Sequence, residues 1–207
     1  MSSNARAHYQ GLIADNVTQL ITLHSNIQSG RGRRHQQDAL HRAGIVLVVA
    51  AWESYVERLL DEAYAAITPG AGAGPHTLLP YQLSAARIPG RIESFNNPNR
   101  KNVQRLLRET LNFDPFPHWT WTAGVKTWTA AQARARLDEW VQIRHRVAHG
   151  NPLPTYPWIL GNNGQPRLTL THMRSCRGFF NAMVRATDSA LRQHLVASFG
   201  VANPWPA

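Results

Sequence analysis

The sequence predicts an all-α fold, a bundle of four main helices joined by loop-rich insertions. Apolar residues recur at helical spacing over four long segments, strand-like alternation is scarce, and glycine and proline gather between these segments. With 207 residues, the chain is long enough for one domain with a sizeable core. We therefore expect a single domain over residues 1–207, with its core at about 35–195 and an N-terminal helix packed on it.

The N-terminal half is expected to form two long helices. The first spans about residues 4–27, and glycines in the basic turn at 29–35 end it. The second spans about 36–67, and its first half, AGIVLVVAAW, is apolar on nearly all sides, which indicates a buried helix. Its second half is amphipathic, and the sequence TPGAGAGP ends it.

The C-terminal half combines irregular segments with two further long helices. Residues 76–128 contain a short helix at about 101–111 and a segment rich in aromatic residues. The third long helix runs from 129 or 130 to 149. The loop that follows, 151–167, holds four prolines and the sequence GNNG, which favours a small hairpin. The last helix spans about 169–197.

The charge balance favours a polyanionic partner. Lysine and arginine total 22 against 12 aspartates and glutamates, a formal net charge of +10, and lysine appears only at Lys101 and Lys126. Arginine binds phosphate through two parallel hydrogen bonds and stacks on bases. The charge therefore predicts a nucleic acid as partner, although a generally basic protein without such a partner would have the same composition.

Composition also bears on compartment and cofactors. The single cysteine, Cys176, allows no internal disulfide and no cysteine cluster for zinc, so we expect a reducing, cytoplasmic setting and no cofactor. The N-terminus lacks the apolar run of a signal peptide. The most apolar stretch is too short to span a bilayer, so we expect no membrane association.

The sequence RHRVAHG, residues 144–150, ends the third long helix. Arg144 falls on the apolar stripe of this helix, where a guanidinium is costly unless it is paired or faces a polar cleft. His145 and His149 are four residues apart and line one edge of the stripe. The apolar residues that share this stripe are Leu137, Trp140, Val141, Val147 and Ala148.

This motif places groups suited to phosphate chemistry at a helix end. Gly150 stops the helix, so His149 lies in the last turn, where the helix dipole favours a protonated imidazole. Such a histidine can act as general acid or base on the RNA 2′-hydroxyl, while Arg144 stabilises charge on the phosphoryl oxygens without a metal. His145 would orient either group or contact phosphate.

The spacing of the two main candidates points to a second chain. Arg144 and His149 are five residues apart, so on an ideal helix they point about 140° apart. Either the long arginine side chain bends around, or a second copy of the helix supplies the other group. Two chains packed about a two-fold axis at these helix ends would line one cleft with both residues. We therefore expect a homodimer with the site at its interface.

These residues resemble the HEPN superfamily of α-helical RNA-cleaving domains. Its hallmark is an arginine, four to six residues and a histidine at the end of a bundle helix, and Arg144, His145 and His149 match it as R-H-x-x-x-H. The segment AWESYVERLLDEA, 51–63, looks like the second helix of the RiboL-PSP type of HEPN domain. Residues 95–114 are similar to the segment that follows that helix.

The likeness covers roughly residues 35–195 and implies a HEPN-like bundle. It also implies a homodimeric, metal-independent endoribonuclease that leaves 2′,3′-cyclic phosphate ends. Proteins of this kind often act as toxins or in defence against phage, which implies an antitoxin or a defence partner protein. The aromatic segment 113–128 and the proline-rich segment 151–167 have no counterpart in the common core of the family.

Further residues are candidates for supporting roles. A buried carboxylate at Glu53 would need a partner, for which Arg144 is preferred and Arg58 or solvent is the alternative. The candidates for RNA contact are Arg146, Arg33, Arg34 and Trp121. The two arginines in the basic turn suit a solvated loop equally well, and Trp121 either stacks on bases or helps to plug one end of the bundle.

Two other interpretations remain open. His145 and His149 have the spacing of a zinc-binding helix, but the position of the catalytic glutamate in zinc proteases is Arg146, which argues against a metal site. Alternatively, the bundle binds RNA or a protein without cleaving it. In that case Arg144 only bridges helices, and His149 only caps carbonyl groups.

Overall fold

The computed structural model describes residues 2–27, 37–68, 82, 84, 86–93 and 95–205, and it confirms an all-α fold. Helices occupy most of the described chain, and the one sheet found there is a two-stranded hairpin. The helices are α1 (Asn4–Leu12), α2 (Gln19–Ile27), α3 (Asp38–Ile67), α5 (Ile88–Glu93), α6 (Arg100–Leu111), α7 (Ala130–Ala148) and α8 (Leu170–Phe199). Shorter elements are the π-helical segment η1 (Ile13–Thr18), the 3-10 turns η2 (Phe116–His118) and η3 (Pro157–Ile159), and the strands β1 (Trp121–Ala123) and β2 (Lys126–Trp128).

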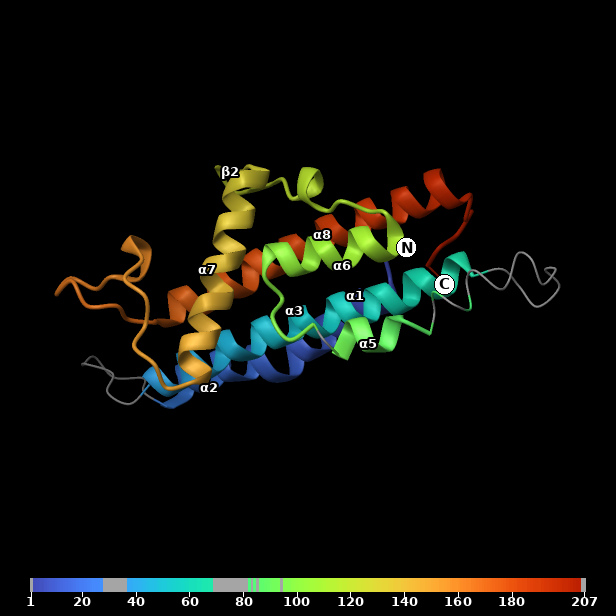
Figure 1. Ribbon diagram of the computed structural model, residues 1–207. Helices are drawn as coiled ribbons and strands as arrows, with labels where there is room; N and C mark the ends of the chain where they lie inside the picture. Colours follow the sequence, from blue (N-terminus) through green and yellow to red (C-terminus); the bar gives the residue numbers. More distant parts are fainter. Residues whose placement is uncertain are drawn as a thin grey trace.

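Helix α3 lies at the centre of the bundle. It packs against α8, α1 and α7, and α7 crosses it at a steep angle (Figure 1). Its length and burial agree with the apolar run seen in the sequence, because Ile45, Val48 and Val49 are fully buried. The Trp52 indole donates a hydrogen bond to the Pro98 carbonyl, at 3.2 Å, and so ties α3 to the segment before α6.

The N-terminal helix is continuous, as expected, but its middle is π-helical. The buried residues Ala5, Tyr9, Ile13 and Val17 are spaced by four. In a regular α-helix this spacing drifts by about 40° per step. The wider π turn counteracts that drift and keeps the buried stripe facing α3. A regular α-helix would rotate the stripe away from α3.

The aromatic segment contains a hairpin that the sequence did not predict, because three-residue strands are too short to show a period. Strands β1 and β2 pair with Trp121 opposite Trp128, and their rings stack with centroids 5.7 Å apart. Trp119 is fully buried and donates to the Thr187 hydroxyl at 2.9 Å. The small hairpin expected in the proline-rich loop is represented by a single bridge between Leu160 and Pro166.

Helix α7 ends near α3 with a buried face that differs from the predicted stripe at three residues. Ile143 is fully buried although the stripe omitted it, whereas Ala148 is exposed and Val147 is half-buried. Helix α7 crosses α3 (Figure 1), and its last residue, Ala148, and the C-cap His149 are exposed. The motif residues at that end are therefore accessible.

The close approach of α3 to α8 generates a stability prediction. A Cβ at Gly44 would lie 2.0 Å from Met173 Sδ and 2.9 Å from its Cγ. We expect Gly44→Ala to lower the free energy of unfolding by about 1–3 kcal/mol, because overpacking outweighs the gain in helix propensity. Gly11→Ala is the matched control, since its Cβ would meet nothing within 4 Å. Urea unfolding of both variants tests this, and equal effects would contradict it.

Candidate active site

The RHRVAHG motif forms the last turn of α7 and its cap. His149 is the C-cap residue, and its backbone N–H donates to the His145 carbonyl at 3.1 Å. Gly150 follows in the left-handed region, with φ of +66°, and Asn151 N–H donates to the Arg146 carbonyl at 2.9 Å. Glycine is favoured at this position because it carries no Cβ. The helix therefore stops where the sequence predicted.

Arg144 is held against the central helix by an ion pair. Its Nη2 donates to Glu53 Oε2 at 2.9 Å, which is the contact the sequence led us to prefer. The two side chains are 25% and 16% exposed, so the pair is largely shielded but open on one side. Burial raises the pKa of Glu53, the positive charge of Arg144 opposes that rise, and Glu57 adds to it. Arg144 thus keeps further N–H donors for a ligand while Glu53 fixes its direction.

The two histidines of the motif form a second pair. The rings of His145 and His149 lie with centroids 4.3 Å apart, and both side chains are exposed. They lie on a different face of the helix from Arg144, because they are one and five residues beyond it. The structure therefore brings Arg144 together with Glu53, and His145 together with His149, on neighbouring faces of one helix end.

An open cavity of about 300 Å³ lies beside the histidine pair. It is bordered on one side by the segment before α6 and on the other by α7, and its lining is rich in amides: Asn97, Asn99, Lys101, Asp138, Val141, Gln142 and His145. The Asn99 side chain caps α6 by accepting from Asn102 N–H at 3.0 Å. Asp138 pairs with Arg100 at 2.9 Å, which joins the two walls.

The amides of this cavity could not be identified from the sequence. Gln142 lies more than 40 positions along the chain from Asn97 and Asn99, so no local spacing connects the three amides. The one signal for them is the asparagine-rich stretch before α6, which lies in the segment similar to the family. The contact between α6 and α7 is what assembles them.

The proline-rich loop after the motif is anchored on α7. Trp158 packs edge-to-face on Trp140, with centroids 4.6 Å apart, and its indole donates to Glu139 at 2.9 Å. Tyr156 donates to the Gln142 side chain. The Arg136 guanidinium lies 4.0 Å over the Trp158 ring. The loop thereby orders the outer side of the helix that carries the motif.

The remaining candidates lie apart from the ion pair. Arg146 is half-buried on α7. Trp121 sits on the hairpin that precedes α7, at the opposite end of that helix from the motif, and packs between Trp128 and Phe179. This position agrees with a plug at one end of the bundle. Arg33 and Arg34 lie outside the described residues.

Neither a metal cluster nor a membrane span is found in the described part of the chain. No group of three or more His, Cys, Asp or Glu side chains there is placed to hold a metal ion. None of its helices combines the length and apolarity needed to cross a membrane.

An all-α bundle with an Arg-x₄-His motif at the accessible end of one helix defines a HEPN-type domain. The chain belongs to the RiboL-PSP-HEPN family, whose model matches residues 12–193. The match starts within the N-terminal helix, earlier than the likeness at about residue 35. HEPN families are generally associated with nucleases that act on RNA. The chain has no significant match among curated proteins or solved structures.

The ion pair generates a prediction for pH dependence. Burial raises the pKa of Glu53 in the folded state. The contribution of Glu53 to stability is therefore fully present below the ordinary glutamate pKa of about 4.3. It is lost as the pH rises through the raised pKa. The free energy of unfolding of the wild type, relative to Glu53→Gln, should therefore fall as the pH rises from 4 toward neutrality. Urea unfolding at several pH values measures this difference. A rise with pH would show that the ion pair outweighs burial.

Proposed function

We propose that this protein is a metal-independent endoribonuclease whose site is the end of α7. The observation that carries the proposal is the placement of Arg144, fixed by Glu53, beside a pair of accessible histidines at a helix end. Membership of the RiboL-PSP-HEPN family supports it. The basic composition suits an RNA substrate.

The proposed reaction uses the nucleophile that RNA itself carries. The His149 imidazole takes the proton of a 2′-hydroxyl, and the 2′-oxygen attacks the adjacent phosphorus. The bond to the 5′-oxygen breaks, and the imidazolium returns the proton to that oxygen. Arg144 stabilises the charge on the non-bridging oxygens. The products are a 2′,3′-cyclic phosphate and a 5′-hydroxyl.

The amide-lined cavity is the proposed place for a nucleotide next to the cleaved bond. Amide side chains can hydrogen-bond to the edges of unstacked bases, which is how single-stranded RNA is commonly recognised. The exposed Lys101 lies at the same cavity and can contact a phosphate. His145 lines the cavity and contacts His149, so it would orient that ring or touch phosphate.

Cleavage of mixed RNA in the presence of EDTA tests the activity. We expect Arg144→Ala and His149→Ala each to lower the rate by at least about 100-fold, because each removes a transition-state interaction. Arg108→Ala and His118→Ala, which replace exposed side chains elsewhere, are matched controls and should cleave like the wild type. Cleavage retained by both site variants would exclude this site. Binding of RNA without cleavage by the wild type would favour a non-catalytic binding bundle.

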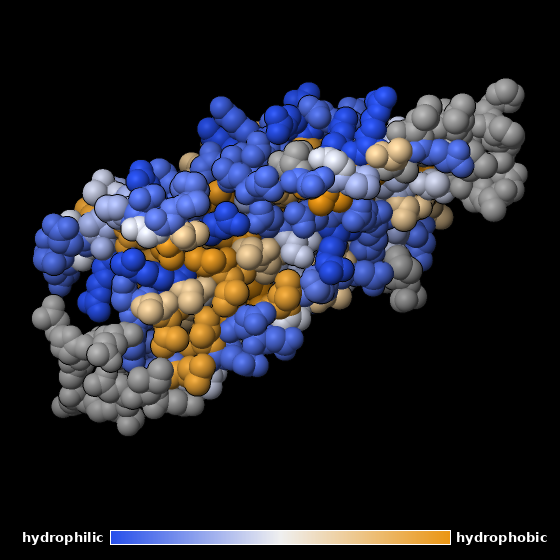
Figure 2. Space-filling view, turned by 60° about the horizontal axis from the view of Figure 1, so that its bottom comes forward, coloured by the Kyte–Doolittle hydropathy of each residue, from blue (hydrophilic) through white to orange (hydrophobic). Residues whose placement is uncertain are grey.

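We further propose that two chains form the working unit. One face of α3 is apolar and largely accessible over its first half, where Ala43, Leu47 and Ala50 are exposed and Val46 is half-buried. Figure 2 brings forward the side on which α2 and α3 lie and shows apolar side chains gathered there. Glu53 follows this stripe by one turn, so a second copy packed on it would bring two ion pairs close together. A single chain keeps Arg144 and His149 on different faces.

Mixing two inactive variants tests the shared site. If each cleft takes groups from both chains, exchange of subunits between Arg144→Ala and His149→Ala should restore about a quarter of the wild-type activity, since half of the dimers then hold one intact cleft. No recovery, despite exchange demonstrated by differently tagged chains, would place the whole site within one chain. Light scattering reports the oligomeric state directly, and an active monomer would contradict the proposal.

The cellular role that we propose is that of a cytoplasmic ribonuclease in a toxin–antitoxin or anti-phage system. The family likeness supports this role, and the single cysteine fits a reducing compartment. Such a system would include an antitoxin or defence partner protein. The genes that flank this one provide the test: a small antitoxin gene or a cluster of defence genes is expected beside it, and isolated housekeeping genes would contradict the role.

A further inference from the structure

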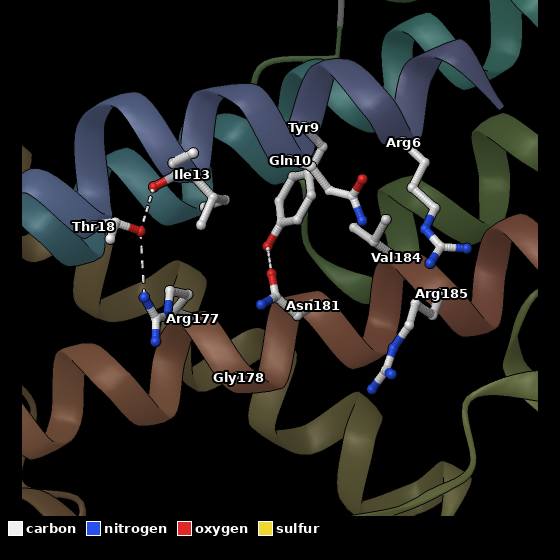
Figure 3. Close-up of a pocket in the computed structure, with 11 residues that line it drawn as sticks. Arg6, Tyr9, Gln10, Ile13, Thr18, Arg177, Gly178, Asn181, Val184 and Arg185 are labelled. Atoms are coloured by element: carbon white, nitrogen blue, oxygen red, sulfur yellow. Dashed lines mark hydrogen bonds between the residues drawn. The ribbon is translucent and has the colours of Figure 1, made fainter. Parts of the chain in front are cut away.

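A second feature of the molecule lies away from the end of α7. A groove of about 580 Å³ runs between the N-terminal helix and α8 (Figure 3). One wall comes from α1 and η1, and the other comes from the middle of α8. The side chains and backbone that line it belong to Arg6, Tyr9, Gln10, Ile13, Ala14, Thr18, Arg177, Gly178, Asn181, Val184 and Arg185.

The charge of this groove is entirely positive. Arg6, Arg177 and Arg185 line it, and no carboxylate does. Arg6 has a carboxylate near it, that of Asp188, which is 2% exposed, accepts hydrogen bonds from Ser3, and lies 4.0 Å from one nitrogen of Arg6. The Arg6 Nε is buried without a hydrogen-bond partner among the described residues. A positively charged groove that no carboxylate lines is suited to an anionic ligand.

The irregular part of the N-terminal helix shapes one wall. In η1, the Thr18 hydroxyl donates to the Ile13 carbonyl at 3.1 Å and accepts from Arg177 Nη1 at 3.4 Å. The π-helical turn therefore positions the group that orients one of the arginines, and π turns occur frequently at functional sites. Between the walls, Tyr9 donates to the Asn181 side chain at 2.9 Å, as Figure 3 shows. These contacts hold the two walls at a set separation.

The arrangement of the arginines favours an extended ligand. Arg177 and Arg185 are eight residues apart, about 12 Å along α8. Figure 3 shows the Arg177 guanidinium toward one end of the groove and those of Arg6 and Arg185 toward the other end, on opposite walls. The aromatic residue that lines the groove, Tyr9, is 1% exposed, so it has no free ring face for a base. A positive groove without stacking rings is suited to a phosphate backbone and not to base recognition.

We propose that this groove binds the sugar–phosphate backbone of an RNA strand, as a contact separate from the site on α7. The proposal rests on RNA being the substrate and adds a sequence-independent anchor for it. Contacts of this kind position a nucleic acid without selecting its sequence. Selection would then belong to the amide-lined cavity beside His145.

The experiment measures binding of a single-stranded RNA in which every 2′-hydroxyl is methylated. This RNA cannot be cleaved by the proposed reaction, so the result does not depend on whether the protein is a nuclease. We expect the double variant Arg177→Gln and Arg185→Gln to weaken binding about tenfold and to reduce the salt slope of log affinity by about 1.4. Arg185→Gln alone should show about half that slope change, and its side chain is exposed without a described partner, so its loss should not perturb folding.

The matched control is Arg108→Gln, which removes one exposed arginine on α6 that lines none of the described cavities. It should leave the affinity and the salt slope near wild type. Similar losses for RNAs of different sequence support recognition of the backbone. The proposal would be overturned by unchanged binding in the double variant or by a loss confined to one RNA sequence. It would also be overturned if the double variant lost no more affinity per charge removed than Arg108→Gln. Binding of ATP to the same double variant is measured in parallel. If the variant lost ATP binding and kept RNA binding, the proposal would be overturned in favour of a free nucleotide.

Discussion

The burial of α3 is the constraint on which the rest of the structure depends. This 30-residue helix packs against α1, α7 and α8, and the aromatic and aliphatic residues of its core are fully buried. Each large apolar side chain removed from water contributes roughly 1.5–3 kcal/mol. The close contact of Gly44 with Met173 sets how near α8 can come. Placement of the other helices follows from covering this one.

Glu53 is shielded on α3 and pairs with a cation, and this ion pair fixes where α7 presents its arginine. The same ion pair that satisfies Glu53 holds the Arg144 guanidinium at the rim of the bundle, 2.9 Å from its partner. A structural requirement and a candidate catalytic role thus fall on one side chain. His149 has no such constraint, because it caps an exposed helix end.

The two basic features of the molecule differ in what they can recognise. The end of α7 combines an arginine, two imidazoles and a cavity lined with amides, which suits reaction at phosphorus beside a recognised base. The groove along α8 offers three guanidinium groups and no free aromatic ring face, which suits a backbone alone. A ribonuclease with both would separate anchoring of the strand from selection of the cleaved bond.

Local sequence signals determined the four long helices and the stop at Gly150, because period and capping residues act over a few positions. The pairing of Glu53 with Arg144, 91 residues apart, was preferred because a buried carboxylate needs a partner. Local signals did not predict the hairpin at Trp121, whose strands are too short to show a period. Tertiary structure alone decided that Asn97 and Gln142 share a cavity, that a π turn interrupts the first helix, and that Arg6 and Arg177 share a groove. These features depend on the packing of distant helices against α3, and no short-range pattern encodes that packing.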